Sequence, residues 1–93
     1  MANSTECVAA IPFEHVIFTD LDGLEGVLVD LNSKKYYQLN ETASFIWRGV
    51  EKRLSSQEIA KELIDQFDVS LERATVSVDQ TLQRLRAEKL LQL

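Results

Sequence analysis

Few residues of this chain have side chains that could do chemistry, and they are scattered. His15 is the only histidine and Cys7 is the only cysteine, so no internal disulfide can form. A cysteine becomes a nucleophile where a basic or histidine neighbour lowers its pKa, and Cys7 has no such neighbour in the sequence. His15 lies in a run of strand-forming residues, where a structural or surface role is the usual one. Neither residue predicts catalysis.

Three acidic residues near the first predicted turn, Asp20, Asp22 and Glu25, raise the alternative of a calcium loop. Their spacing from the neighbouring glycines does not match the EF-hand pattern, so a solvated turn is predicted instead. The chain also has no Cys-x-x-Cys, no His-x-x-x-His and no glycine-rich phosphate loop. We therefore expect no enzyme, no metal and no cofactor, but a protein that binds.

Length, composition and charge indicate one domain. The 93 residues are 45% hydrophobic and 27% charged, which is typical of soluble globular proteins. The net charge of −5 argues against nucleic acid and anionic membranes as partners. No apolar run approaches the ~20 residues of a membrane span, and the N-terminus lacks the features of a secretory signal. We expect a cytoplasmic protein with a flexible segment over residues 1–12 and a domain over residues 13–93.

The first part of this domain has the pattern of three short strands. Strand-forming residues fill 13–19, 26–31 and 34–39, and Val27, Val29 and Leu31 alternate in the second run. The intervening Asp22-Gly23 and Asn32-Ser33 are turn signals. Short loops between consecutive strands predict an antiparallel meander.

The second part has the pattern of three helices. Asn40, Ser55 and Ser70 are the predicted N-caps, and Glu58 would complete a capping box with Ser55. The predicted helices run from 41 to 51 or 52, from about 56 to 67 and from about 71 to 89. The apolar stripes expected on the second and third helices are Ile59, Ala60, Leu63, Ile64 and Phe67, then Leu71, Ala74, Val78, Leu82 together with Thr81, and Leu85. The fold class is therefore α+β.

The third predicted strand is the first candidate binding surface. Natural sheets usually protect an edge strand with proline, charge or a covering element, yet only Lys34 and Lys35 are charged here, and no proline follows Pro12. Two interpretations remain open. Either the third helix covers the edge and Tyr36 and Tyr37 are core residues, or the edge accepts a peptide strand by β-augmentation.

The second candidate surface is one face of the third helix beside its apolar stripe. Thr75, Asp79, Leu82, Gln83 and Arg86 follow a helical spacing on this face. It is either a solvated face or a second wall of the binding site. Leu82 and Val76 would bring apolar groups to it, and Arg86 could hold a carboxylate.

Several of these segments together resemble the PqqD-like family. The segments are Gly26-Val-Leu-Val-Asp-Leu, Lys35-Tyr-Tyr-Gln-Leu-Asn-Glu-Thr-Ala, Ile46-Trp47, Ile59-Ala60 with Leu63, and Phe67-Asp68-Val69. The likeness covers about residues 16–93. The family includes the pyrroloquinoline quinone biosynthesis D protein and the precursor-peptide recognition elements of ribosomal peptide pathways, including lasso peptides. The resemblance implies a winged-helix-like fold of three antiparallel strands followed by three helices.

The resemblance also implies a non-catalytic function. Such a protein would hold a precursor's leader peptide as a fourth strand between the third strand and third helix. It would present the peptide to a radical-SAM enzyme, a cyclase or a leader peptidase. The residues expected along the peptide are Lys35, Tyr36, Tyr37 and Gln38, and those expected to face it from the helix are Thr75, Val76, Asp79, Leu82, Gln83 and Arg86.

The sequence departs from the family pattern in two places. Lys34 stands where many relatives have glycine, and residues 51–54 lack the glycine usual in the first interhelical turn. Neither position lies in the proposed binding site.

Two alternatives to peptide binding are kept. The helices from Ser56 to Lys89 would also suit a winged-helix DNA-binding regulator. The basic residues Arg73, Arg84, Arg86 and Lys89 favour that function, whereas Asp79, Glu88 and the net acidity oppose it. The edge strand could instead pair with a second copy of the chain, giving a homodimer.

Overall fold

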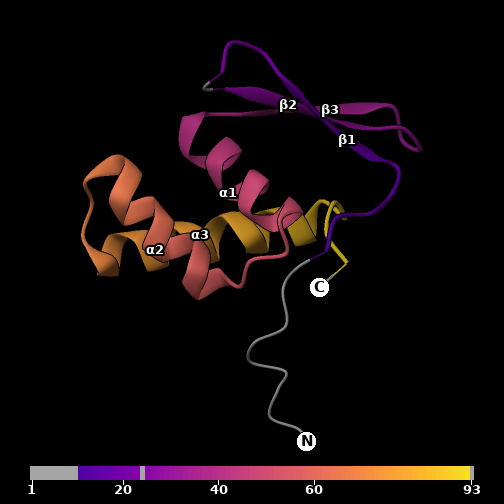
Figure 1. Ribbon diagram of the computed structural model, residues 1–93. Helices are drawn as coiled ribbons and strands as arrows, with labels where there is room; N and C mark the ends of the chain where they lie inside the picture. Colours follow the sequence, from indigo (N-terminus) through magenta and orange to yellow (C-terminus); the bar gives the residue numbers. More distant parts are fainter. Residues whose placement is uncertain (1–10, 24, 93) are drawn as a thin grey trace, which may run out of the picture.

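A three-stranded antiparallel sheet lies against three helices in the computed structural model, which describes residues 11–23 and 25–92 (Figure 1). The elements are β1 (Val16–Asp20), β2 (Gly26–Asp30), β3 (Lys35–Leu39), α1 (Glu41–Glu51), α2 (Ser56–Phe67) and α3 (Leu71–Ala87). The predicted α+β class, with three strands before three helices, is confirmed. Within the described ranges no helix combines the length and apolarity that crossing a membrane requires.

The strands follow the order β1-β2-β3, so the meander predicted from the short loops is confirmed. Leu28 pairs with Phe18 on one side and with Tyr37 on the other, and it is fully buried. The alternating Val27 and Val29 lie on the opposite face and are only half-buried. The residue that β2 contributes to the core is therefore Leu28.

The first strand is shorter than the predicted 13–19 because its leading residues form a turn. The Val16 N–H donates to the Phe13 carbonyl at 3.1 Å, and β1 begins at Val16. The preceding residues pair elsewhere: the Gln92 N–H donates to the Ile11 carbonyl at 2.7 Å, and Pro12 bridges to Leu91. The apolar tail beyond α3 thus packs, and Leu91 is 4% exposed. Cys7 lies outside the described residues.

The turn into β3 is built without glycine. Lys34 has a φ of +65°, the left-handed region that glycine occupies most easily. Its N–H donates to the Asp30 carbonyl at 2.7 Å. The Asp30 carboxylate accepts from the N–H groups of Asn32 at 2.9 Å and Ser33 at 3.3 Å. The hydrogen bonds that Asp30 accepts therefore hold Lys34 in the left-handed conformation, which glycine would adopt without strain.

All three predicted helix caps are confirmed. The Asn40 Oδ1 accepts from the Ala43 N–H at 2.8 Å, and Ser70 caps α3 in the same way. Ser55 and Glu58 form the reciprocal capping box. α3 ends at Ala87 rather than at the predicted residue 89. Because each cap fixes where its helix begins, the caps also fix which residues each helix turns toward the sheet.

The core lies between the sheet and the helices, with Trp47 of α1 fully buried at its centre. Gly49 lies where α1 meets α2. A Cβ there would be 2.8 Å from Ile59 Cγ1, so glycine permits the close approach. Of the stripe predicted for α3, Ala74, Val78, Leu82 and Leu85 are buried, whereas Leu71 is 61% exposed.

Candidate functional site

β3 is an edge strand whose outer side is open. It pairs with β2 alone, and a strand directs alternate backbone groups to each side. Apart from the ladder to β2, the described residues make no hydrogen bond to the backbone of residues 35–38. At the end of the strand the Leu39 carbonyl accepts from Ser44 Oγ at 3.4 Å. Tyr36, a core residue in the first interpretation of this edge, is 74% exposed.

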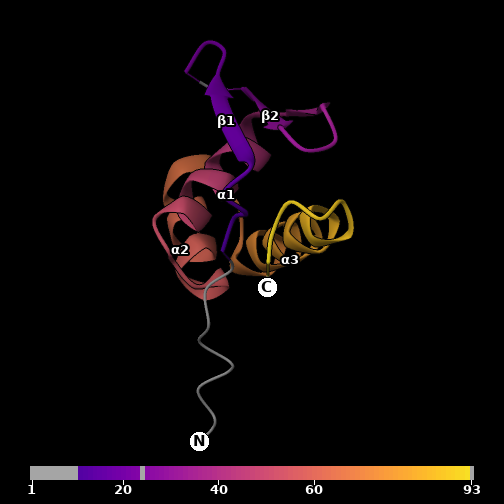
Figure 2. The same cartoon turned by 90° about the vertical axis from the view of Figure 1, so that its right-hand side faces the viewer.

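A hollow of about 300 Å³ separates β3 from α3, and it is called the β3 groove below. In Figure 2 the β2–β3 hairpin and α3 extend to the same side of α1. Apolar and polar side chains from the sheet, from the helices and from the segments next to them line the groove. The apolar residues are Tyr37, Leu39, Ala43, Leu85 and Leu90, and the polar residues are Asn40, Thr42, Ser77, Gln80, Thr81, Arg84 and Glu88.

The β3 groove continues into a second hollow of about 260 Å³ at the end of the strand. Asn40, Ala43 and Arg84 line both hollows, while Glu25 and Gln38 line only the second. Between them the two hollows are lined by Tyr37, Gln38 and Leu39 of β3. Arg84 lies at the junction between them.

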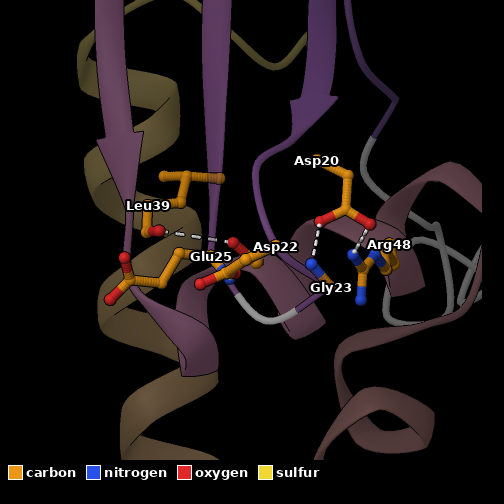
Figure 3. A network of polar contacts seen from close by, with 7 residues as sticks. Asp20, Asp22, Gly23, Glu25, Leu39 and Arg48 are labelled. Atoms are coloured by element: carbon orange, nitrogen blue, oxygen red, sulfur yellow. Dashed lines mark hydrogen bonds and ion pairs between the residues drawn. The ribbon is translucent and has the colours of Figure 1, made fainter.

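The loop between β1 and β2 places Glu25 at the end of the groove. Asp20 accepts from the Gly23 N–H at 2.9 Å and pairs with Arg48 of α1 at 3.0 Å (Figure 3). The Glu25 N–H donates to Asp22 Oδ1 at 3.0 Å. The acidic residues that suggested a calcium loop therefore hold the turn in shape and attach it to α1. In the described part of the chain no group of three or more side chains could hold a metal ion.

The structure divides the predicted site residues between two surfaces. Of the β3 residues, Tyr37 lines the β3 groove and Gln38 lines its continuation. Lys35 is exposed on the same strand, and Tyr36 is 74% exposed on the outer face of the sheet. All four lie on the open edge strand, as expected.

The α3 residues predicted to face the third strand do not line the β3 groove. Asp79, Leu82, Gln83 and Arg86 instead line a separate hollow of about 110 Å³, shared with Val50, Leu54, Ser56 and Ile59 of the α1–α2 region. Thr75 and Val76 are exposed and line neither hollow. This smaller hollow is called the α2 hollow below.

The helical spacing used for that prediction applies equally to both sides of an amphipathic helix. The buried stripe of α3 has a polar flank on each side, and both flanks follow the same spacing of three and four residues. Ser77, Thr81, Arg84 and Glu88 form the flank toward β3, whereas Asp79, Gln83 and Arg86 form the flank toward α2. Leu82 was predicted both in the stripe and on this face, and at 5% exposed it is buried in the stripe.

His15 has a structural position at the start of the sheet. Its ring stacks on Phe13, with centroids 5.2 Å apart, and its Nε2 lies 3.7 Å from Asp30 Oδ1. Burial raises the pKa of Asp30, but the hydrogen bonds from Ser33 and Asn32 and the nearby His15 lower this pKa by more than burial raises it. The net pKa is below the ordinary value. His15 does not line the β3 groove.

Comparisons with known proteins agree with this architecture. Residues 25–91 match the family described as coenzyme PQQ synthesis protein D (PqqD). A search of curated proteins found no match. Among solved structures, TbiB1 in complex with the TbiA(beta) leader peptide is 23% identical, with a TM-score of 0.82 over 88% of this chain and 94% of that one. The lasso peptide synthetase B1 complexed with the leader peptide is 21% identical, with a TM-score of 0.81 over 90% and 98%. These two likenesses show a shared fold.

Proposed function

The chain belongs to the PqqD family, and from this premise we propose that it captures the leader peptide of a ribosomally made precursor. The peptide adds to β3 as a fourth strand and lies in the β3 groove. The observation that carries the proposal is an edge strand left open directly beside a partly apolar groove. Both solved relatives of the same fold were determined with a leader peptide, which supports the same ligand class here.

The proposal involves two kinds of contact with the peptide. Its backbone pairs with the outward-facing groups of Lys35, Tyr36, Tyr37 and Gln38, the β-augmentation mode. Its side chains alternate between the two faces of the enlarged sheet. Every second side chain therefore points into the β3 groove, toward Tyr37, Leu85 and Leu90. From α3, Ser77, Thr81 and Arg84 border the peptide.

Magnitudes show that the backbone contact alone is insufficient. Four or five strand hydrogen bonds contribute roughly 0.5–1.5 kcal/mol each, while association costs at least about 4 kcal/mol. Micromolar binding needs about −8 kcal/mol. The difference has to come from apolar anchors, each of which contributes roughly 1.5–3 kcal/mol when buried. Even at the favourable end of these ranges the shortfall is about 4.5 kcal/mol, so at least two apolar side chains have to be buried in the groove.

The proposed role is to present, not to transform, the peptide. A modifying enzyme of the radical-SAM or cyclase class, or a leader peptidase, would then act on the part of the precursor that extends beyond the groove. A homodimer through β3 would occupy the same edge, so peptide and second copy would compete. Light scattering with and without peptide separates these two uses of β3.

The experiment that tests the proposal is a selection of binders from a displayed random peptide library, followed by synthesis of an enriched peptide. A series of variants of that peptide, each N-methylated at a single position, removes one backbone donor at a time. Because only every second peptide N–H faces β3, we expect affinity losses at every second position. Amide exchange should slow at alternate residues of β3, those whose N–H groups face away from β2, when the unmodified peptide binds.

Two results would contradict the proposal. Failure of the library to yield any binder excludes peptide capture, and equal tolerance of N-methyl groups at all positions excludes strand addition. Binding to duplex DNA that weakens steeply with salt would favour the regulator alternative instead. Against that alternative, α3 mixes the basic Arg73, Arg84 and Arg86 with the acidic Glu72 and Asp79.

A further inference from the structure

Arg84 occupies a particular place in the groove. Among the residues that the structure describes, it is the one charged residue that lines both hollows, while Glu88 lines only the larger one and Glu25 only the smaller one. Glu88, four residues further along α3, is spaced for an i,i+4 ion pair with Arg84. Nevertheless, across residues 11–23 and 25–92, the guanidinium of Arg84 has no ion-pair partner and donates no hydrogen bond. The guanidinium is exposed in the free protein.

A bound strand would change the surroundings of this guanidinium. A peptide along β3 has to pass the junction of the hollows, so it covers Arg84 and removes water from it. A charge that loses water without gaining a partner is strongly unfavourable.

Building on the proposed function, we propose that Arg84 is a specificity-determining residue that selects an acidic side chain in the peptide. A guanidinium binds a carboxylate through two parallel hydrogen bonds, which fixes geometry as well as charge. Successive side chains on one face of a strand are two residues apart. The recognised pattern is therefore an apolar residue on the groove floor and an Asp or Glu two positions away. This pair sets the register of the peptide on β3.

Arg86 offers a matched control on the same helix. It is an exposed arginine of α3 as well, but it lines the α2 hollow and not the β3 groove. Arg84→Glu and Arg86→Glu change the net charge of the protein equally. Any difference between them therefore reports the position of the charge and not its amount.

The test selects binders from one random peptide library with the wild type, Arg84→Glu and Arg86→Glu. We expect the wild type and Arg86→Glu to enrich an acidic residue two positions from an apolar one. Arg84→Glu should enrich Lys or Arg at that same position. With a synthetic wild-type binder, replacing its acidic residue by the matching amide should weaken binding to the wild type about tenfold. The same replacement should leave the already weak binding to Arg84→Glu unchanged.

The outcomes separate this inference from the proposed function. Binders that pair with β3 but carry no charge preference, or the same preference in all three proteins, overturn the role of Arg84 and leave strand addition standing. An acidic preference lost equally in Arg84→Glu and Arg86→Glu overturns it as well, because it shows a diffuse effect of charge. Absence of any binder rejects both proposals together.

Discussion

The two flanks of α3 have similar sequences and different surroundings. The flank toward β3 borders a hollow of about 300 Å³ beside the outer edge of that strand, whereas the flank toward α2 borders a hollow of about 110 Å³. Each flank carries one arginine, Arg84 or Arg86, among uncharged and acidic residues. The difference lies in what faces them. β3 presents free backbone groups, whereas the opposing helices have satisfied their own backbone hydrogen bonds.

This comparison shows why only one flank is suited to strand addition. A helix surface offers side chains alone, but an edge strand also offers a regular row of donors and acceptors. The β3 groove combines that row with apolar side chains at a spacing a peptide strand can follow. The α2 hollow provides neither the row nor the length.

The largest expected effect comes from the stripe between the two flanks. Leu82→Asp puts a charge at a position that is 5% exposed, and we expect more than about 3 kcal/mol of destabilisation. Thermal unfolding followed by circular dichroism measures it. Peptide binding should vanish only because folding fails. A folded Leu82→Asp protein that has lost peptide affinity would show that Leu82 contacts the peptide, and it would contradict the assignment of Leu82 to the buried stripe.

The next effect distinguishes the flanks directly. Thr81→Trp fills the β3 groove, and Gln83→Trp places the same bulk at the α2 hollow. Losing one apolar anchor corresponds to roughly 1.5–3 kcal/mol, so we expect Thr81→Trp to weaken peptide affinity by about ten- to a hundredfold. Gln83→Trp should leave it within twofold. Fluorescence anisotropy with a labelled library-derived peptide checks both, and equal losses would contradict the assignment.

A smaller effect is expected from a change in the packing between α1 and α2, and it tests whether that side of the molecule contributes to stability alone. Gly49→Ala would set a Cβ 2.8 Å from Ile59 Cγ1, and such overpacking costs about 1–3 kcal/mol. Urea unfolding should show this loss of stability. The folded fraction should bind the peptide with unchanged affinity, because Gly49 does not line the β3 groove. Reduced affinity of the folded protein would show that the two sides are coupled.

The smallest effect concerns the turn that leads into the strand wall of the groove. Lys34→Gly relieves the left-handed conformation at φ +65°, and after the entropy cost of glycine we expect a gain of about 0.5 kcal/mol. Denaturant midpoints measure it. Because Lys34 precedes β3 and lines neither hollow, peptide affinity should not change. A loss of stability would mean that the lysine side chain contributes more than its backbone strain costs.

A pH titration isolates the same turn. The pKa of Asp30 is lowered in the folded protein, so its stabilising contribution is present above the ordinary pKa of an aspartate. That contribution is lost as the pH falls through the lowered value. We expect Asp30→Asn to flatten the stability profile in this acidic range. An unchanged profile would show that the hydrogen bonds from Asn32 and Ser33 contribute little.

The sequence predicted most of the local structure correctly, because its signals act over a few residues. A cap such as Asn40 accepts from an N–H three positions away, and the capping box of Ser55 and Glu58 is equally short-range. The face of β2 was less clear, since Val27 and Val29 are as apolar as Leu28. Which of them enters the core depends on the helix that packs beneath the sheet.

By itself the sequence determined the order of the elements, their class and the unprotected character of the third strand. It also carried the family likeness that residues 25–91 confirm. Only the tertiary structure decided which flank of α3 faces that strand. Both flanks repeat at the helical period and carry the same kinds of residue, so periodicity cannot distinguish them. The choice comes from contacts between distant segments, which bring Arg84 to β3 and turn Arg86 toward α2.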